Sequence, residues 1–154
     1  FSSTSRNGFA KAHEISAFSL LPLAEGAIPM MKKRGGGSII SMSFIGSVLA
    51  VPHYYVMGPA KASLESSSRY LAKEIGPDNI RVNVISPGPI KTLSASGIKD
   101  FAELMKIGGE HSAMKRTVTQ EEVAQTAVFL ASDASSGITG QVIYVDCGYS
   151  IMAN

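Results

Sequence analysis

The chain has 154 residues, 45% hydrophobic and 17% charged, which is the balance of one globular domain with a buried core. Its net charge of +2 comes from scattered basic residues, and no apolar run reaches the roughly 18 residues that span a bilayer. We therefore expect no nucleic acid and no membrane as partners. The single cysteine excludes an internal disulfide, and the three histidines lack metal-ligand spacing, so no metal site is expected.

Residues 5–33 are expected to form one long helix. Its apolar positions recur at helical spacing and are Phe9, Ile15, Phe18, Leu21 and Ile28. Pro22 and Pro29 each lack an amide donor and crowd the preceding turn, so both should disturb the helix, with a kink near Pro22. Three glycines at 35–37 end the helix, and residues 38–43 follow as a short strand.

A loop at residues 44–53 leads into a second helix, expected at about 55–75. Its apolar stripe consists of Ala60, Leu64, Leu71 and Ile75. Pro59 is compatible with this helix only in the first turn, and the Gly76-Pro77 pair ends it.

The second half of the chain predicts two more strands and one more helix. Residues 80–86 form an apolar strand, and residues 93–116 are irregular or weakly helical, as expected of a lid. Thr119 and Glu122 match a capping box that opens a helix through about residue 132, and residues 140–146 are the last strand.

Strands separated by helices of this length predict an α/β fold with a parallel sheet and right-handed crossovers. We expect the C-terminal part of a Rossmann-type doubly wound parallel sheet, in which residues 1–154 form the catalytic portion of a single domain. No glycine-rich phosphate loop is present, so the N-terminal nucleotide-binding half is expected to be missing. The ligand crevice should lie at the strand ends, after Ser43 and Ser86.

Both candidate chemical motifs follow those strand ends. If Tyr54 begins a helix, a spacing of seven places it on the same helical face as Lys61. An ammonium near a phenol favours phenolate character and strengthens the phenol as a hydrogen-bond donor. In the following loop, Gly88 would let the backbone approach a flat ligand closely. Taken alone, each motif also has an ordinary structural explanation. The first could be a tyrosine at a helix start with a solvated lysine, and the second could be an ordinary turn.

Together, these residues resemble the enoyl-acyl-carrier-protein reductases, a branch of the short-chain dehydrogenase/reductase superfamily. The resemblance rests on six residues between Tyr54 and Lys61 and on RVNVISPGPIKTLSASGIKDF at 81–101. Ordinary members of the superfamily place three residues between tyrosine and lysine, and Met57 occupies that tyrosine position here. The similarity continues through residues 115–123 and 137–146 and corresponds to the family's C-terminal three-fifths.

The resemblance implies NADH-dependent reduction of trans-2-enoyl-acyl-carrier-protein thioesters in fatty-acid synthesis, with NADH/NAD as the cofactor. The implied catalytic residues are Tyr54, which would bond the thioester carbonyl oxygen, and Lys61, which would hold the nicotinamide ribose. The implied cofactor-binding residues are Lys61, Gly88, Pro89, Ile90, Thr92 and Ser94. The implied substrate-binding residues are Phe44, Tyr54, Met57, Ile98, Phe101 and Leu104.

The resemblance also implies an acyl-carrier-protein-bound enoyl substrate as partner, a homotetramer or homodimer, and a location in the bacterial cytoplasm or the plastid stroma. Phe44 stands where many bacterial relatives carry a second tyrosine, so it is expected to supply packing alone. Two alternatives stay open at this point: a 3-ketoacyl or other carbonyl reductase of the same superfamily, and an inactive interaction subunit.

Overall fold

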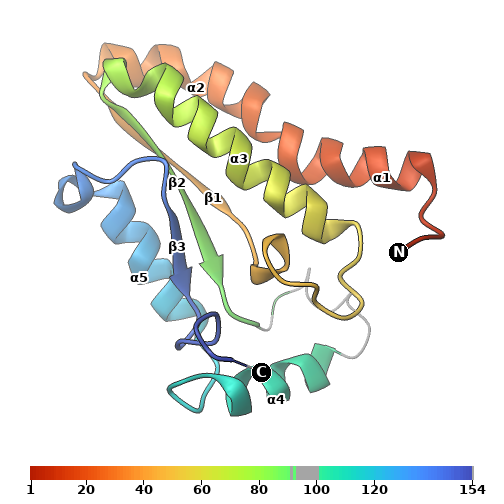
Figure 1. Cartoon of the computed structure of the whole chain (residues 1–154). Helices are drawn as coiled ribbons and strands as arrows, with labels where there is room; N and C mark the ends of the chain where they lie inside the picture. Colours follow the sequence, from red (N-terminus) through yellow and green to blue (C-terminus); the bar gives the residue numbers. More distant parts are fainter. Residues whose placement is uncertain (91, 93–100, 154) are drawn as a thin grey trace.

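The computed structural model describes residues 1–90, 92 and 101–153. Within them the sheet has three parallel strands in the order β1-β2-β3: β1 (Gly37–Met42), β2 (Ile80–Pro87) and β3 (Val142–Val145). Helices α2 (Leu20–Lys33) and α3 (Met57–Ile75) cover one face of this sheet, and α5 (Gln120–Ala131) covers the other (Figure 1). The expected α/β fold with a parallel sheet is confirmed, with α3 and α5 serving as the crossovers.

The first long helix is divided by a π-helical turn. It consists of α1 (Arg6–His13), the π-helix η1 (Glu14–Phe18) and α2 (Leu20–Lys33). The Ser19 amide donates to the Glu14 carbonyl at 3.1 Å, which is the wider π-type bond. The expected disturbance is therefore present but lies just before Pro22, because this proline occupies the first turn of α2. Pro29 was expected to disturb the helix as well, yet α2 continues past it to Lys33.

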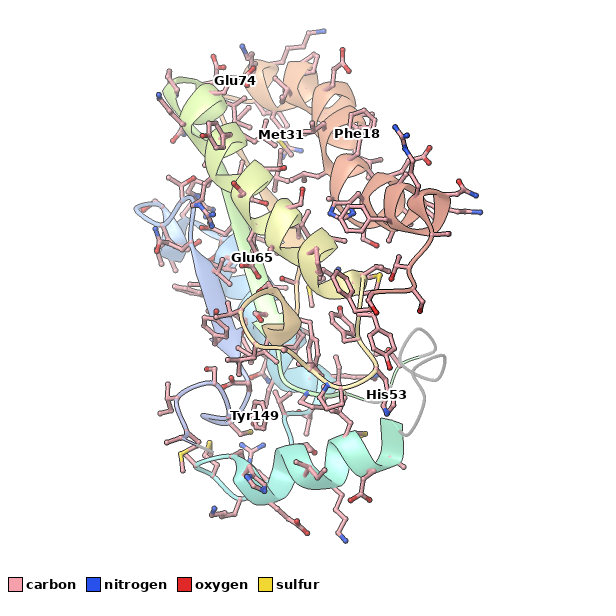
Figure 2. The ribbon with its side chains drawn as sticks, turned by 45° about the vertical axis from the view of Figure 1, so that its right-hand side comes forward. Phe18, Met31, His53, Glu65, Glu74 and Tyr149 are labelled. Atoms are coloured by element: carbon pink, nitrogen blue, oxygen red, sulfur yellow. The ribbon has the colours of Figure 1, made fainter. Side chains whose placement is uncertain are left out.

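Two alanines and one leucine, rather than most of the apolar positions named from the sequence, form the buried face of this helix. Ala17, Leu20 and Ala24 are buried, since alanine allows the helix axis to approach the sheet closely. Four of the five apolar positions named from the sequence are exposed, and only Ile28 packs against the core; the exposed ones are Phe9, Ile15, Phe18 (Figure 2) and Leu21.

Helix α3 (Met57–Ile75) packs its apolar stripe on the same face of the sheet. Pro59 lies in its first turn, as required, and the helix passes at Gly76 into the 3₁₀ turn η3 (Gly76–Asp78). Asn79 then adopts a left-handed backbone with φ 58° and leads into β2. The core on this side consists of Ala17, Leu20, Ala24, Leu64, Leu71, Ala72, Ile75, Ile80 and Val82.

The second core lies between the sheet and α5 (Gln120–Ala131), which is followed by the 3₁₀ turn η5 (Asp133–Ser135). Its buried members are Ile85, Val118, Val123 and Leu130. The expected capping box at Thr119 and Glu122 is present. At the other end of α5, the Arg81 guanidinium donates to the carbonyls of Leu130 at 2.9 Å and Ser132 at 3.1 Å. This cation complements the helix dipole and ties α5 to β2.

Beyond the carboxyl ends of the strands lies α4 (Phe101–His111) (Figure 1). The expectation of irregular or weakly helical chain at 93–116 is therefore wrong for residues 101–111, which form a regular helix. No helix among the described residues is long and apolar enough to cross a membrane. The same residues contain no cluster of histidine, cysteine and carboxylate side chains suited to hold a metal.

Candidate active site

The carboxyl end of β1 holds Lys61, at the end of the sheet where the ligand crevice is expected. The Lys61 ammonium, in the second turn of α3, donates to the Met42 carbonyl at 2.8 Å. Burial lowers the pKa of Lys61, and the nearby Glu65 carboxylate partly opposes that shift. A lysine held at the end of a parallel strand stands where doubly wound sheets bind their ligands.

Tyr54 does not begin α3, as the spacing argument required, but lies in the turn that precedes it. His53 and Tyr55, on either side of Tyr54, have left-handed backbones with φ 62° and 39°, so the chain cannot be helical there. The Tyr54 amide donates to Val51 O at 3.2 Å, and Tyr54 O accepts from the Met57 amide at 3.0 Å. The position of Tyr54 therefore depends on this turn and its packing, and not on a helical face shared with Lys61.

Aromatic packing fixes the Tyr54 ring. It meets Phe44 edge to face with 4.9 Å between ring centroids. Gly46 lies so close that an added Cβ would be 2.4 Å from Tyr54 Cδ1. Burial raises the pKa of Tyr54 to about 12. This shift is opposite to the expected phenolate character, and it keeps the phenol protonated at neutral pH, as a hydrogen-bond donor must be.

The loop after β2 packs more closely against its neighbours than the sequence indicated. Gly88 and Pro89 are buried, and the Gly88 amide donates to Val145 O at 3.0 Å. An added Cβ on Gly88 would lie 3.1 Å from Asp146 Cα. The structural reason for this glycine is therefore close contact with the backbone after β3, where the sequence argument invoked a flat ligand.

The remaining cofactor-site candidates lie along the same loop. Ile90 packs its side chain into the core beside α5, and Thr92 is half-buried. Ser94 falls outside the described residues. A Cβ added to Gly108 of α4 would lie 3.0 Å from Pro89 Cγ, so α4 packs directly against this loop.

The substrate-site candidates are brought together only in part. Phe44 and Tyr54 are in contact, and half-buried Leu104 lies on α4. Met57 points elsewhere, since its sulfur lies 3.8 Å from the Ser16 hydroxyl of η1. Phe101 begins α4, and Ile98 lies outside the described residues.

Sequence reasoning missed a buried polar pair next to these residues. The Ser43 hydroxyl, directly after β1, donates to the Glu65 carboxylate, and both side chains are buried. The available signal was a glutamate four positions after Lys61 on the face of α3 that carries buried Ser68. A charged residue on such a face rarely lacks a partner.

Comparison with known proteins agrees with this geometry. Residues 1–150 match the family model described as enoyl-(acyl carrier protein) reductase. The chain belongs to the enoyl-(acyl carrier protein) reductase family. The resemblance found in the sequence is thus confirmed.

Individual relatives extend the comparison. The chain is 57% identical over 152 residues to the NADH-dependent enoyl-[acyl-carrier-protein] reductase FabI of Nostoc, covering 99% of this chain and 58% of that protein. The NADPH-dependent FabI of Staphylococcus aureus is 51% identical and is matched over 57% of its length, with 97% of this chain covered. The chain thus spans less than two thirds of these curated relatives.

A solved structure confirms the Rossmann-like fold. The Bacillus cereus enoyl-acyl carrier protein reductase, crystallised with NADP+ and indole naphthyridinone, superposes with a TM-score of 0.94 at 49% identity. The match covers 99% of this chain and 58% of that protein.

Proposed function

We propose that this chain forms the catalytic part of an NADH-dependent enoyl-acyl-carrier-protein reductase of fatty-acid synthesis. The observation that carries the proposal is the position of Tyr54, half-buried against Phe44 beside the carboxyl end of β1, where Lys61 is also held. Family membership supports catalytic roles for these two residues. The reaction would reduce a trans-2-enoyl thioester that is attached to acyl carrier protein.

A nicotinamide dinucleotide would lie at the carboxyl ends of β1 and β2. Lys61 offers an ammonium at the end of β1, and the loop of Gly88, Pro89 and Ile90 follows the end of β2. The Ser86 hydroxyl at that strand end is buried without a hydrogen-bond partner among the described residues. When bound, the dinucleotide supplies the hydride that reaches the β-carbon of the enoyl group. Lys61 would hold the ribose, while the loop from Gly88 to Thr92, with Ser94, would hold the nicotinamide and phosphate region.

Tyr54 would stabilise the charge that develops on the substrate. Hydride addition to the β-carbon moves negative charge to the thioester oxygen, and a phenol with a pKa of about 12 donates a hydrogen bond to it without losing its proton at neutral pH. Phe44 would hold the ring in place. Leu104 on α4, together with Ile98 and Phe101, would cover the acyl chain and exclude water. Met57 is a weaker substrate contact, because its sulfur faces Ser16.

We further propose that the N-terminal nucleotide-binding half of the domain is supplied by sequence outside this chain. Coverage of 58% of the Nostoc relative supports this, and so does the position of β1 at an edge of the sheet among the described residues. Exposed apolar side chains on α2 and α3, such as Leu23 and Tyr70, support a homotetramer or homodimer. The bacterial relatives support a cytoplasmic location in a bacterium.

The test is NADH oxidation by a complete protein, made by joining this chain to the part of the Nostoc relative outside the match. It would be offered an enoyl thioester and, separately, a 3-ketoacyl thioester. We expect consumption with the enoyl substrate alone, and slower consumption when NADPH replaces NADH. Turnover of only the ketoacyl substrate would show a carbonyl reductase instead. No NADH oxidation with either substrate would indicate an inactive subunit.

A further inference from the structure

Three consecutive residues at the carboxyl end of β1, beginning with its last residue, Met42, connect the sheet to both proposed catalytic side chains. The carbonyl of Met42 accepts from the Lys61 ammonium at 2.8 Å. The ring of Phe44 packs edge to face on the ring of Tyr54. Between them, the hydroxyl of Ser43 donates to the carboxylate of Glu65. Any shift of this three-residue segment would therefore move the contacts of Lys61 and Tyr54 together.

Glu65 is placed to prevent such a shift. It lies about halfway along α3 (Figure 2), and its side chain is only 7% exposed, while Ser43 is 5% exposed. The Ser43 amide also donates to Ile85 O at 2.7 Å, so the residue is held by β2 on one side and by α3 on the other. Burying a carboxylate is costly unless it is bonded, and a neutral residue of similar size would pack here without that cost.

A second contact along the same two elements shows what is particular about Glu65. Ser41 and Ser68 approach within 3.4 Å, and Ser68 also donates to Leu64 O at 2.9 Å. This contact also links β1 to α3, inside the strand and one residue before Met42. The body of β1 therefore has its own attachment to α3, and Glu65 supplies the side-chain bond between α3 and Ser43 just beyond the strand end.

We propose that Glu65 is a positioning residue, which acts through its hydrogen bond with Ser43 to hold Met42 and Phe44 where they orient Lys61 and Tyr54. Glu65 need not touch substrate or cofactor. This inference rests on the proposed function, because it assigns Glu65 to the same reaction.

The test compares variants in the complete protein described above. Ser43→Ala and Glu65→Leu each remove the hydrogen bond, Glu65→Gln keeps an acceptor for Ser43, and the double variant removes both partners. We expect Ser43→Ala and Glu65→Leu to lower kcat with the enoyl thioester about tenfold or more, since small misplacements of reacting groups are costly. Glu65→Gln should restore kcat to within about threefold of the parent, and the double variant should be no worse than either single one.

Two controls separate positioning from simple loss of stability. Ser68→Ala removes a buried hydroxyl from the same helix, and Glu74→Gln repeats the amide change at the far, exposed end of α3 (Figure 2). Both should leave kcat within about twofold of the parent, even where the melting temperature falls. NADH affinity, followed by fluorescence, should weaken in Ser43→Ala and Glu65→Leu but not in the controls.

The outcomes distinguish this inference from the proposed function. A parent protein that does not reduce the enoyl thioester would refute the proposed function. An active parent whose folded Ser43→Ala variant keeps full kcat and NADH affinity would refute the role of Glu65. Ser43→Ala decides the question even where Glu65→Leu fails to fold, because it leaves α3 unchanged.

Discussion

At Tyr54, burial and ring packing determine the chemistry more than charge does. The phenol is desolvated and packs edge to face on Phe44, and its pKa of about 12 keeps it protonated at neutral pH. A neutral donor is what a developing oxyanion requires. The Lys61 ammonium is engaged with Met42 O, which suits a role in holding a ligand better than a role in ionising the phenol.

Gly46 offers a direct test of this packing. A Gly46→Ala side chain would begin 2.4 Å from Tyr54 Cδ1, so the ring must move. We expect a loss of about 1–3 kcal/mol in the free energy of unfolding and a fall in kcat larger than any change in NADH affinity. Denaturant unfolding and steady-state kinetics on the complete protein would measure both.

The control for that variant is Gly26→Ala in α2, where an added Cβ meets nothing within 4 Å. This exposed helical position should gain about 0.5–1 kcal/mol from the better helix propensity of alanine. Equal effects at both glycines would contradict the packing account.

Lys61→Ala should weaken NADH binding about tenfold or more, because a hydrogen bond from a charged donor contributes about 1.5–3 kcal/mol. Fluorescence titration of the complete protein would measure this. Lys73→Ala, on the exposed last turn of α3, is the matched control and should bind NADH like the parent. Unchanged affinity in Lys61→Ala would remove this lysine from the cofactor site.

The sequence allowed Tyr54, Lys61 and the loop at 86–92 to be named, but not their geometry. His53 and Tyr55 take left-handed conformations that neither residue type signals, so the seven-residue spacing suggested a helix that does not form there. The contact between Ser43 and Glu65 joins residues 22 positions apart, and only the packing of α3 on the sheet creates it. The sequence indicated that Gly88 allows a close approach of the backbone. It did not show that Asp146 is the neighbour that lies so close.

At the scale of elements, the start of α5 is the most strongly determined helix end. The Arg116 guanidinium donates to both Glu122 oxygens at 2.6 and 3.0 Å, and the Thr119 amide adds a bond at 2.9 Å. These hydrogen bonds, that from Arg116 first, lower the pKa of Glu122 from 4.5 to about 2.

A pH dependence of stability follows from that shift. Because the folded pKa is lowered, Glu122 contributes stability above pH 4.5, and this is lost as the pH falls toward 2. We expect the difference in melting temperature between the parent and Glu122→Gln to shrink over this window. Glu121→Gln, which removes the same charge from the same turn, should show little change in its difference from the parent.

Elements with strong local signals were predicted well, and those without them were not. Gly76 and Pro77 marked the end of α3, and Thr119 with Glu122 marked the start of α5. The π-helix at Glu14–Phe18 has no such signal, and its main packing partner, α3, is distant in sequence. Helix α4 is rich in glycine and methionine, and its packing against Pro89 supports it where local propensity does not.

At the scale of the whole molecule, the main structural question is what lies beside β1. It pairs only with β2 among the described residues, and an apolar groove of about 550 Å³, lined by α2, β1 and Lys61, lies beside it. Unpaired strand edges attract further strands. The remaining length of the relatives would supply a strand there.

Hydrogen exchange on the complete protein tests that placement. If another strand pairs with β1, its amides at residues 38–42 should exchange as slowly as those of central β2. Fast exchange at alternate β1 amides, with β2 fully protected, would show that the edge stays open. Residues 82–84 of β2 serve as the internal reference, since they are fully buried.

The measurement that bears most directly on the account is the rate of NADH oxidation with an enoyl thioester by the complete protein and its Tyr54→Phe variant. NADH affinity would be determined for both. The account predicts that kcat falls about a hundredfold on loss of the donor to the oxyanion, while NADH affinity stays within about twofold. A Tyr54→Phe variant as fast as the parent would contradict it, because the buried phenol would then have no part in the reaction.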